Sequence, residues 1–281
     1  MKLWSEGMLL PRQERRRSAQ PLAERCAAHE RYTANRERHE KRGVFFWLHL
    51  WQRWPGFELC AVLEADRERL GWERLRGVCA AHEGLHAAYG LHPVYLHEHR
   101  AEHLDALPGW IERERPCAVG ECGLDWFIDN PDRDRQQAIL ARHLELAKDC
   151  GLPVILHARR AVDDVTAALR RVGGLRGVVH SFAGSVQQAE ALFALGFHVG
   201  IGGPVTYERA SRLRGIVARM PLEFLLLETD SPDQPLHGHR GARNEPAFLV
   251  EVLRAVAQLR GESEEKVADA TTANAKRLFA L

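Results

Sequence analysis

The sequence predicts an α/β fold, a (β/α)₈ or TIM barrel, and three observations lead to this prediction. From residue 85 onward, apolar segments of strand length alternate strictly with amphipathic segments of helix length. Near-continuous apolar strands are typical of a parallel sheet that is covered by helices. No glycine-rich phosphate loop follows an early strand, which disfavours an open doubly wound sheet. The 281 residues accommodate a barrel of about 250 residues and an atypical N-terminal region.

The first 43 residues differ from the rest of the chain. Arginine and glutamate crowd segments 12–17 and 36–42, and glycine is sparse. We therefore divide the chain into an atypical N-terminal region, residues 1–43, and a barrel domain, residues 44–281. Two apolar runs, 44–50 and 59–63, would supply the first two of the eight strands.

The remaining elements follow in order. Apolar residues at helical spacing, such as Leu70, Leu75 and Val78, predict a helix over 64–82. Gly151 and Pro153 end the helix predicted over 132–150, and Gly261 ends the helix predicted over 246–260. Ser263 suits the N-cap of the last predicted helix, 263–281. Strands are predicted at 85–92, 117–120, 153–157, 177–180, 197–202 and 224–228. Helices are predicted at 97–114 (interrupted near Pro108 and Gly109), 132–150, 161–172, 185–195, 211–220, 246–260 and 263–281.

Composition narrows the class of protein. No apolar run approaches the ~18 residues of a membrane span, and the first residues lack the apolar core of a signal peptide. Six cysteines form no CxxC pair, which favours free thiols over a zinc–thiolate site. A net charge of +1 neither indicates nor excludes a nucleic-acid partner. We expect a cytoplasmic monomer with no membrane association and no obligate protein partner.

Side chains suited to a metal site follow the carboxyl ends of five predicted strands. In a parallel barrel these ends open onto one face, where the active site lies. Two imidazoles and two carboxylates there would suit Zn²⁺, Mn²⁺ or a similar ion. Such an ion activates water and polarises a carbonyl or phosphoryl oxygen, and a nearby carboxylate can accept the proton. The residues at the strand ends are His92, Glu121 with Asp125, His157 with Arg159, His180, and Asp230 with Ser231.

Each of these residues also has a purely structural interpretation. Asp230 precedes Ser-Pro and could cap a turn. Asp125 could orient a ligand or cap a loop, and His92 could be structural or face the substrate. Histidines outside the strand ends are expected to be solvated or structural, namely His97, His99, His237 and His239.

Seven ordered motifs between about residue 72 and the end of the chain resemble those of the TatD family of metal-dependent hydrolases, the TatD-type deoxyribonucleases. The family's GE-x-GLD, PVILH-x-R, VH-x-F-x-GS and LETD-[SA]-P motifs are matched by GECGLD (120–125), PVILHAR (153–159), VHSFAGS (179–185) and LETDSP (227–232). GLHP (90–93), RNEP (243–246) and NAKRLF (274–279) also fit.

This resemblance implies a barrel of the amidohydrolase type with one or two divalent ions, Mg²⁺, Mn²⁺ or Zn²⁺, that hydrolyses phosphodiester bonds in DNA, often from a 3′ end. It implies that Glu121, His157, His180 and Asp230 are metal ligands. Glu121 would bridge two ions where two are present, and Asp230 would be the general base. Arg159 and His92 would lie near the substrate phosphate.

One family motif is missing. The family opens with D-x-H-x-H on the first strand, whose histidines bind the second metal. Residues 1–70 contain only His29, His39 and His49, none spaced as HxH. Divergence, or a frameshifted or misassigned start, would produce this pattern. The chain would then lack one metal site, close its barrel poorly or be inactive.

Three functional hypotheses follow. The leading one is a TatD-type deoxyribonuclease. The second keeps the same site but acts on another ester or amide, such as an aminoacyl-tRNA ester. The third is a catalytically impaired barrel that survives as a binding protein.

Overall fold

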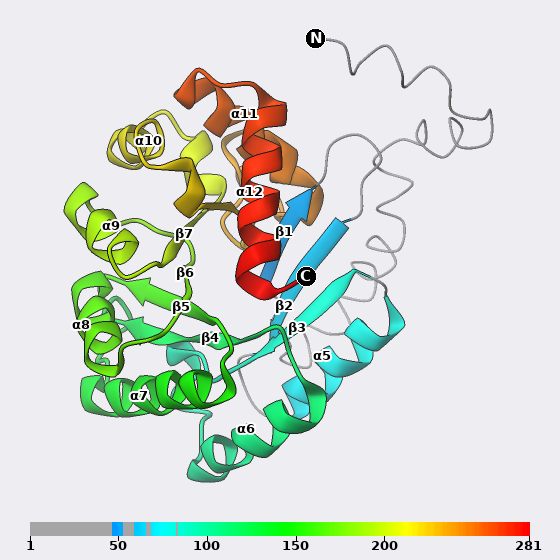
Figure 1. The fold of residues 1–281 in the computed structure, drawn as a ribbon, viewed down its shortest axis with the longest axis vertical. Helices are drawn as coiled ribbons and strands as arrows, with labels where there is room; N and C mark the ends of the chain where they lie inside the picture. The colour runs from blue at the N-terminus through cyan, green and yellow to red at the C-terminus, as the bar shows by residue number, and fades with distance from the viewer. Residues whose placement is uncertain (1–46, 53–58, 66–68, 83) are drawn as a thin grey trace.

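The computed structural model describes residues 47–52, 59–65, 69–82 and 84–281, shown in colour in Figure 1. The predicted N-terminal region, residues 1–43, lies outside the described residues. The helix predicted over 64–82 begins too early, because residues 64 and 65 belong to a strand that ends at Ala65, and the described helix spans Arg69–Ala81. The predicted α/β fold of the TIM-barrel type is confirmed in the described residues, which form one curved and largely parallel sheet.

One sheet organises the described part of the chain, and its eight strands follow one another in sequence order. Strands β2 to β8 are parallel. All of their carboxyl ends therefore open on the same side. The strands are β1 (Trp47–Gln52), β2 (Leu59–Ala65), β3 (Leu85–Tyr89), β4 (Ala118–Asp125), β5 (Val154–Arg159), β6 (Gly177–Val179), β7 (His198–Ile201) and β8 (Leu225–Leu227).

The prediction that the run at 44–50 completes a parallel barrel is wrong. Strand β1 pairs antiparallel with β2, so that Leu48 lies opposite Leu63. The physical reason is the length of the connection. Only residues 53–58 join the two strands, whereas a parallel crossover needs a dozen residues or more.

The helices follow the strands as the alternation predicted. Figure 1 shows α5 to α9 in succession around the outside of the curved sheet. They are α5 (Arg69–Ala81), α6 (Ala101–Glu114), α7 (Arg133–Cys150), α8 (Val162–Val172), α9 (Val186–Phe193), α10 (Ser211–Val217), α11 (Leu249–Arg260) and α12 (Glu264–Phe279). Short 3₁₀ turns include η2 (Pro93–Tyr95) and η5 (His237–His239).

Alternation along the strands gives the sheet two apolar faces. Outward residues such as Tyr89, Val119 and Leu156 belong to the main core under the outer helices. Inward residues form a second core with the C-terminal helix α12. That core comprises Ala88, Ala118, Ile155, Val178, Leu226, Ala275, Leu278 and Phe279. The inward face is therefore filled near the amino ends of the strands, which leaves their carboxyl ends for polar side chains.

Helix α6 and strand β4 both differ from their predicted extents. Helix α6 runs through Pro108 without interruption. Leu107, Trp110 and Ile111 are buried on both sides of Pro108, and this packing outweighs the local cost of proline in a helix. Strand β4 continues five residues beyond its predicted end at Gly120, because glycines let its backbone adopt positive φ at positions 120 and 123.

Two further expectations concern the whole chain. No helix in the described residues combines the length and apolarity needed to cross a membrane. The cysteines at 79, 117, 122 and 150 are free thiols, as predicted for this part of the chain.

A matched pair of glycine substitutions tests the account of β4. Gly123 has φ +151°, and a Cβ there would overlap the carbonyl oxygen of His157 on β5. We expect Gly123→Ala to lower the free energy of unfolding by about 3 kcal/mol. Gly109 is exposed in α6, and a Cβ added there would meet nothing within 4 Å, so its alanine variant should gain up to about 1 kcal/mol. Urea unfolding of both variants checks this, and equal effects would contradict it.

Candidate metal and active site

A bulge in β4 turns the first site carboxylate inward. Val119 pairs with Val154 and Cys122 with Leu156, so three steps along β4 match two along β5. Val119 and Cys122 both face the outer core. The extra residue lies at Gly120 and Glu121, and it brings the Glu121 side chain to the inward face, where it is fully buried. Such bulges re-aim a side chain next to functional sites.

The next two strands need no bulge to supply their histidines. Ile155 and Val178 face inward, and a period of two places His157 and His180 on the same face, at the carboxyl ends of β5 and β6. His180 is almost fully buried, and the His157 side chain is 12% exposed. The alternation of the sheet therefore gathers both imidazoles beside Glu121.

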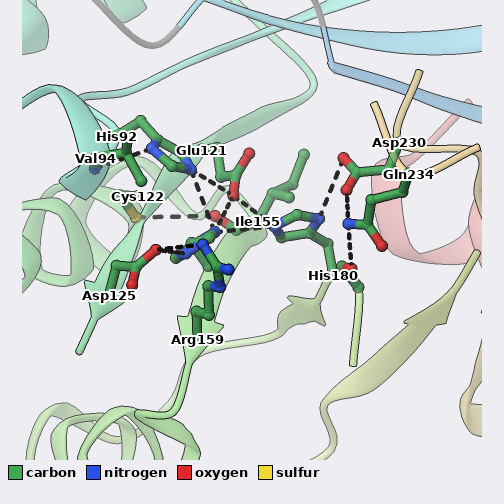
Figure 2. Close-up of polar contacts among 12 residues, drawn as sticks. His92, Val94, Glu121, Cys122, Asp125, Ile155, Arg159, His180, Asp230 and Gln234 are labelled. Carbon is green, nitrogen blue, oxygen red and sulfur yellow. Dashed lines mark hydrogen bonds and ion pairs between the residues drawn. The ribbon is translucent and has the colours of Figure 1, made fainter. Parts of the chain in front are cut away.

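A single oxygen of Glu121 is the meeting point of three imidazoles (Figure 2). Its Oε1 lies 3.0 Å from His92 Nε2, 3.0 Å from His157 Nδ1 and 2.5 Å from His180 Nε2. His157 Nδ1 is also 3.2 Å from His92 Nε2 and 3.4 Å from His180 Nε2. The predicted residues Glu121, His157 and His180 are thus brought together, and His92 joins them.

The negative charge of Glu121 and the positive charge of His180 stabilise each other. Burial by itself would raise the pKa of Glu121, but His180, His92 and the hydrogen bonds from the imidazoles hold the pKa well below its ordinary value. Burial by itself would lower the pKa of His180, but Glu121, with smaller contributions from Asp230 and Glu228, raises the pKa to about 10. In the absence of another cation, the buried carboxylate is therefore compensated by imidazolium.

Asp125 fixes the orientation of His157. Its Oδ2 lies 2.9 Å from His157 Nε2, while its Oδ1 accepts the backbone N–H groups of Phe127 at 2.7 Å and Ile128 at 3.2 Å. Burial by itself would lower the pKa of His157, but its hydrogen bonds to Asp125 and Glu121 raise it. If a cation takes the place of the Nδ1 proton, the Nε2–H still donates to Asp125 and keeps Nδ1 directed at the group. Both roles considered for Asp125, orienting a ligand and capping a loop, are present in its contacts.

The tautomer of His92 follows from a backbone contact. The N–H of Val94 donates to His92 Nδ1 at 3.1 Å, so Nδ1 carries the lone pair. A neutral His92 must then carry its proton on Nε2, and this N–H donates to Glu121 Oε1. Burial lowers the pKa of His92, which keeps the ring neutral. His92 therefore acts as a hydrogen-bond donor in the group rather than offering it a lone pair.

Two buried histidines hold the backbone around His92: His99, which was expected to be solvated or structural, and His143, which was given no role. His143 Nε2 accepts the N–H of Leu91 at 3.0 Å, and its Nδ1 donates to the carbonyl of Ile139 at 2.8 Å. His99 Nε2 donates to the carbonyl of His92 at 2.8 Å. The sequence signal for His143 was its place on the apolar stripe of α7, where a lone polar residue implies a specific partner.

Asp230 lies at the edge of the group rather than inside it. Its Oδ1 is 3.9 Å from His180 Nδ1, and its Oδ2 accepts a hydrogen bond from Gln234 Nε2 (Figure 2). Gln234 also donates to Ser181 Oγ at 2.6 Å. Neither Ser181 nor Gln234 was singled out in the sequence, since their roles depend on loops whose approach only the fold decides.

Glu228 is a second buried carboxylate that sequence reasoning passed over. Its Oε1 accepts the N–H of Ser181 at 2.6 Å and lies 3.9 Å from His180 Nδ1. The signal was available, since Glu228 follows inward-facing Leu226 by two residues and belongs to the same LETD motif as Asp230. Its contact with Ser181 fixes the loop that follows His180.

The group lies in a cleft of about 920 Å³. Arg159, predicted to face substrate, lines this cleft with a side chain that is 53% exposed, and its nearest carboxylate oxygen is Asp125 Oδ2 at 4.0 Å. The guanidinium is thus presented to solvent beside the buried group. The cleft also has walls from the loops after β5, β6 and β8.

The other histidines noted in the sequence do not join the group. His97 is exposed near Glu98. His237 packs edge-on against Tyr207, and His239 lies 2.8 Å from Glu251.

The residues present fit a divalent metal ion. In a tetrahedral site with bonds of about 2.0–2.1 Å, neighbouring ligand atoms lie roughly 3.3 Å apart. Glu121 Oε1, His157 Nδ1 and His180 Nε2 are separated by 2.5–3.4 Å. One atom each from His92, Glu121 and His157 also lies within 4.8 Å of the others, but the proton on His92 Nε2 favours His180 over His92. Glu121 Oε2 is buried without a hydrogen-bond partner, a cost that a cation would remove.

Comparison with known proteins agrees with this geometry. A profile of the family described as TatD related DNase matches residues 54–280. The chain belongs to this family. It is 44% identical over 222 residues to the metal-dependent hydrolase YjjV of Escherichia coli K12, covering 78% of this chain and 85% of that protein. The crystal structure of YjjV, described as a TatD homologue, superposes with a TM-score of 0.76 at 41% identity and covers 78% of this chain and 86% of that one.

A second relative carries an activity in its name. The 3′-5′ ssDNA/RNA exonuclease TatD of Rahnella sp. Y9602 is 39% identical over 202 residues, covering 66% of this chain and 75% of that protein. The predicted membership of the TatD family is therefore confirmed. As a TatD-family protein, the chain is a metal-dependent hydrolase.

The contact between Asp125 and His157 predicts a variant with weakened metal binding. Asp125→Asn keeps an oxygen for the Phe127 N–H but removes the charge that orients His157. We expect the affinity for Zn²⁺ or Mn²⁺ to fall 10- to 100-fold, measured by competition with a chromogenic chelator. Asp129→Asn, an exposed change in the following loop, is the control. Equal affinity of the Asp125 variant and the parent would contradict the role of Asp125.

The buried His143 predicts an acid-sensitive step in stability. Burial lowers the pKa of His143 to about 4, below that of the unfolded chain. The unfolded state therefore takes up this proton first, and stability is lost as pH falls from about 6.5 to 4. The loss from this group is on the order of 3 kcal/mol.

The test is urea unfolding of the parent and of His143→Gln at several pH values. The variant is expected to be less stable at pH 7 and to show a shallower decline below pH 6.5. Parallel declines in the two proteins would show that His143 does not titrate in this way.

Proposed function

We propose that this protein is a deoxyribonuclease that hydrolyses phosphodiester bonds, with a divalent ion held by Glu121, His157, His180 and Asp230. The observation that carries the proposal is the convergence of three imidazoles on one oxygen of a fully buried Glu121. An arrangement of this kind, open to a cleft with an exposed guanidinium, suits an anionic substrate. It also argues against a catalytically impaired barrel, because burying a carboxylate costs stability and a barrel without a metal site would gain nothing from it.

The ion would supply two effects when bound: it lowers the pKa of water and polarises a phosphoryl oxygen. Imidazole and carboxylate ligands suit Zn²⁺ and Mn²⁺, whereas Mg²⁺ prefers oxygen ligands. Glu121 contributes by bringing negative charge into the buried group, and it would lie between two ions if a second is bound.

The chain's own residues supply proton transfer and substrate binding. Asp230 is the proposed general base, since its Oδ2 is held by Gln234 while its Oδ1 faces the group near His180. The Nε2–H of His92 would donate to a phosphate oxygen that approaches Glu121. The exposed guanidinium of Arg159 would bind the phosphate electrostatically.

DNA is the proposed substrate because this phosphate-binding chemistry lies in a cleft of about 920 Å³ that the exposed Arg159 also lines. The relative named as an ssDNA/RNA exonuclease supports a nucleic-acid substrate. A carboxylic ester, such as an aminoacyl-tRNA ester, would need the same activated water. Assays on both DNA and carboxylic esters are therefore needed to distinguish these two substrates.

Substitution of Asp230 tests the mechanism. Asp230→Asn preserves shape and removes the base, so kcat on a single-stranded oligodeoxynucleotide with Mg²⁺, Mn²⁺ or Zn²⁺ should fall by about 10²–10⁴-fold. Asp105→Asn, an exposed change on α6, should leave kcat unchanged. Unchanged turnover in the Asp230 variant would refute the assigned role. Ester hydrolysis without DNA cleavage would overturn the proposed substrate.

A further inference from the structure

An exposed aromatic ring stands beside the cleft. Among the described residues, two large hydrophobic side chains are exposed, Phe127 at 44% and Val186 at 38%. Phe127 lies in the loop between β4 and α7, and its N–H donates to Asp125 Oδ1 at 2.7 Å. The carboxylate that orients His157 therefore also fixes the backbone that carries the ring.

Two consecutive arginines pack on this ring. The guanidinium carbons of Arg159 and Arg160 lie 3.9 Å and 4.2 Å from the centroid of Phe127, and both arginines line the cleft. Successive side chains of a strand point to opposite faces, so two neighbours do not normally reach one ring. Arg160 reaches it because its φ of +55° turns the chain at the end of β5.

Nearby carboxylates have other partners. Asp164 accepts the indole N–H of Trp126 at 2.7 Å, and Asp163 accepts a hydrogen bond from Gln188 at 2.9 Å. The arginines are thus held on an aromatic ring rather than in close ion pairs with these acids. Figure 2 shows Arg159 near Asp125, on the side of the group away from Asp230.

We propose that Phe127, Arg159 and Arg160 form a binding site for an unpaired nucleotide next to the scissile phosphate. Aromatic rings and guanidinium planes both stack on nucleobases, and arginines bind the flanking phosphates. Stacking is tolerant of sequence because every base has a π-face. A base inside a duplex is already stacked on its neighbours, so the site selects single-stranded nucleic acid without sequence preference. The inference rests on the proposed phosphodiester substrate and deepens it.

The test measures binding rather than turnover. Fluorescence anisotropy in EDTA compares a single-stranded oligodeoxynucleotide with an oligomer of the same length that carries abasic sites, and with a duplex. Phe127→Ala should weaken binding of the base-containing strand about tenfold and leave the abasic strand unaffected. Phe127→Tyr should restore binding, and Val186→Ala, the matched exposed hydrophobic, should have no effect.

Arg160→Gln separates charge from stacking. It should weaken binding of both single strands and reduce the slope of log affinity against log salt by about 0.7, the value for one phosphate contact on a single strand. Thermal unfolding of each variant verifies that it is folded.

The outcomes distinguish this inference from the proposed function. If Phe127→Ala binds base-containing and abasic strands as the parent does, the stacking site is refuted, even when Asp230→Asn abolishes cleavage. If the base preference depends on Phe127 but no phosphodiester is cleaved, the stacking site stands and the deoxyribonuclease proposal fails. Tighter binding of duplex than of single strand would also refute the inference.

Discussion

The structure of this protein depends on one buried carboxylate. Glu121 has no exposed surface, and one imidazole nitrogen each of His92, His157 and His180 lies within 3.0 Å of its Oε1. A carboxylate in such a place is costly unless positive charge or hydrogen bonds compensate it. The compensating groups come from different strands, so the group forms only when the sheet has its native curvature and register. Fold and site are therefore coupled through a single oxygen atom.

The backbone around this oxygen is built to keep the group in place. The bulge in β4 interrupts the regular pairing with β5 and turns the Glu121 side chain inward. Behind the imidazoles, Asp125 orients His157, while His99 and His143 hold the backbone on both sides of His92. Such supporting contacts limit the rotamers of the site residues and so determine how well they bind a metal. The same Asp125 also fixes the loop that carries Phe127, which links the buried group to the rim of the cleft.

Several parts of the sequence could be interpreted in advance, and others could not. The elements from residue 85 onward were predictable, because period-two and helical patterns are local. The direction of β1 and the continuity of α6 were mispredicted, since one depends on the length of a connection and the other on the burial of Trp110 and its neighbours. The first-strand histidine pair of the family is missing from the sequence, and the side chain of His49 lies outside the described residues.

The sequence by itself determined the class of fold, the family and the set of strand-end residues, because motif spacing and periodicity are properties of the chain alone. Tertiary structure decided the position and the hydrogen-bond role of each of those residues in the site. It placed His92 as a donor through the N–H of Val94, set Asp230 at the edge of the group, and brought Gln234 to Asp230, a contact that no local pattern indicates. The physical reason is that hydrogen-bond geometry and burial depend on segments far apart in the chain, and these meet only when the sheet folds.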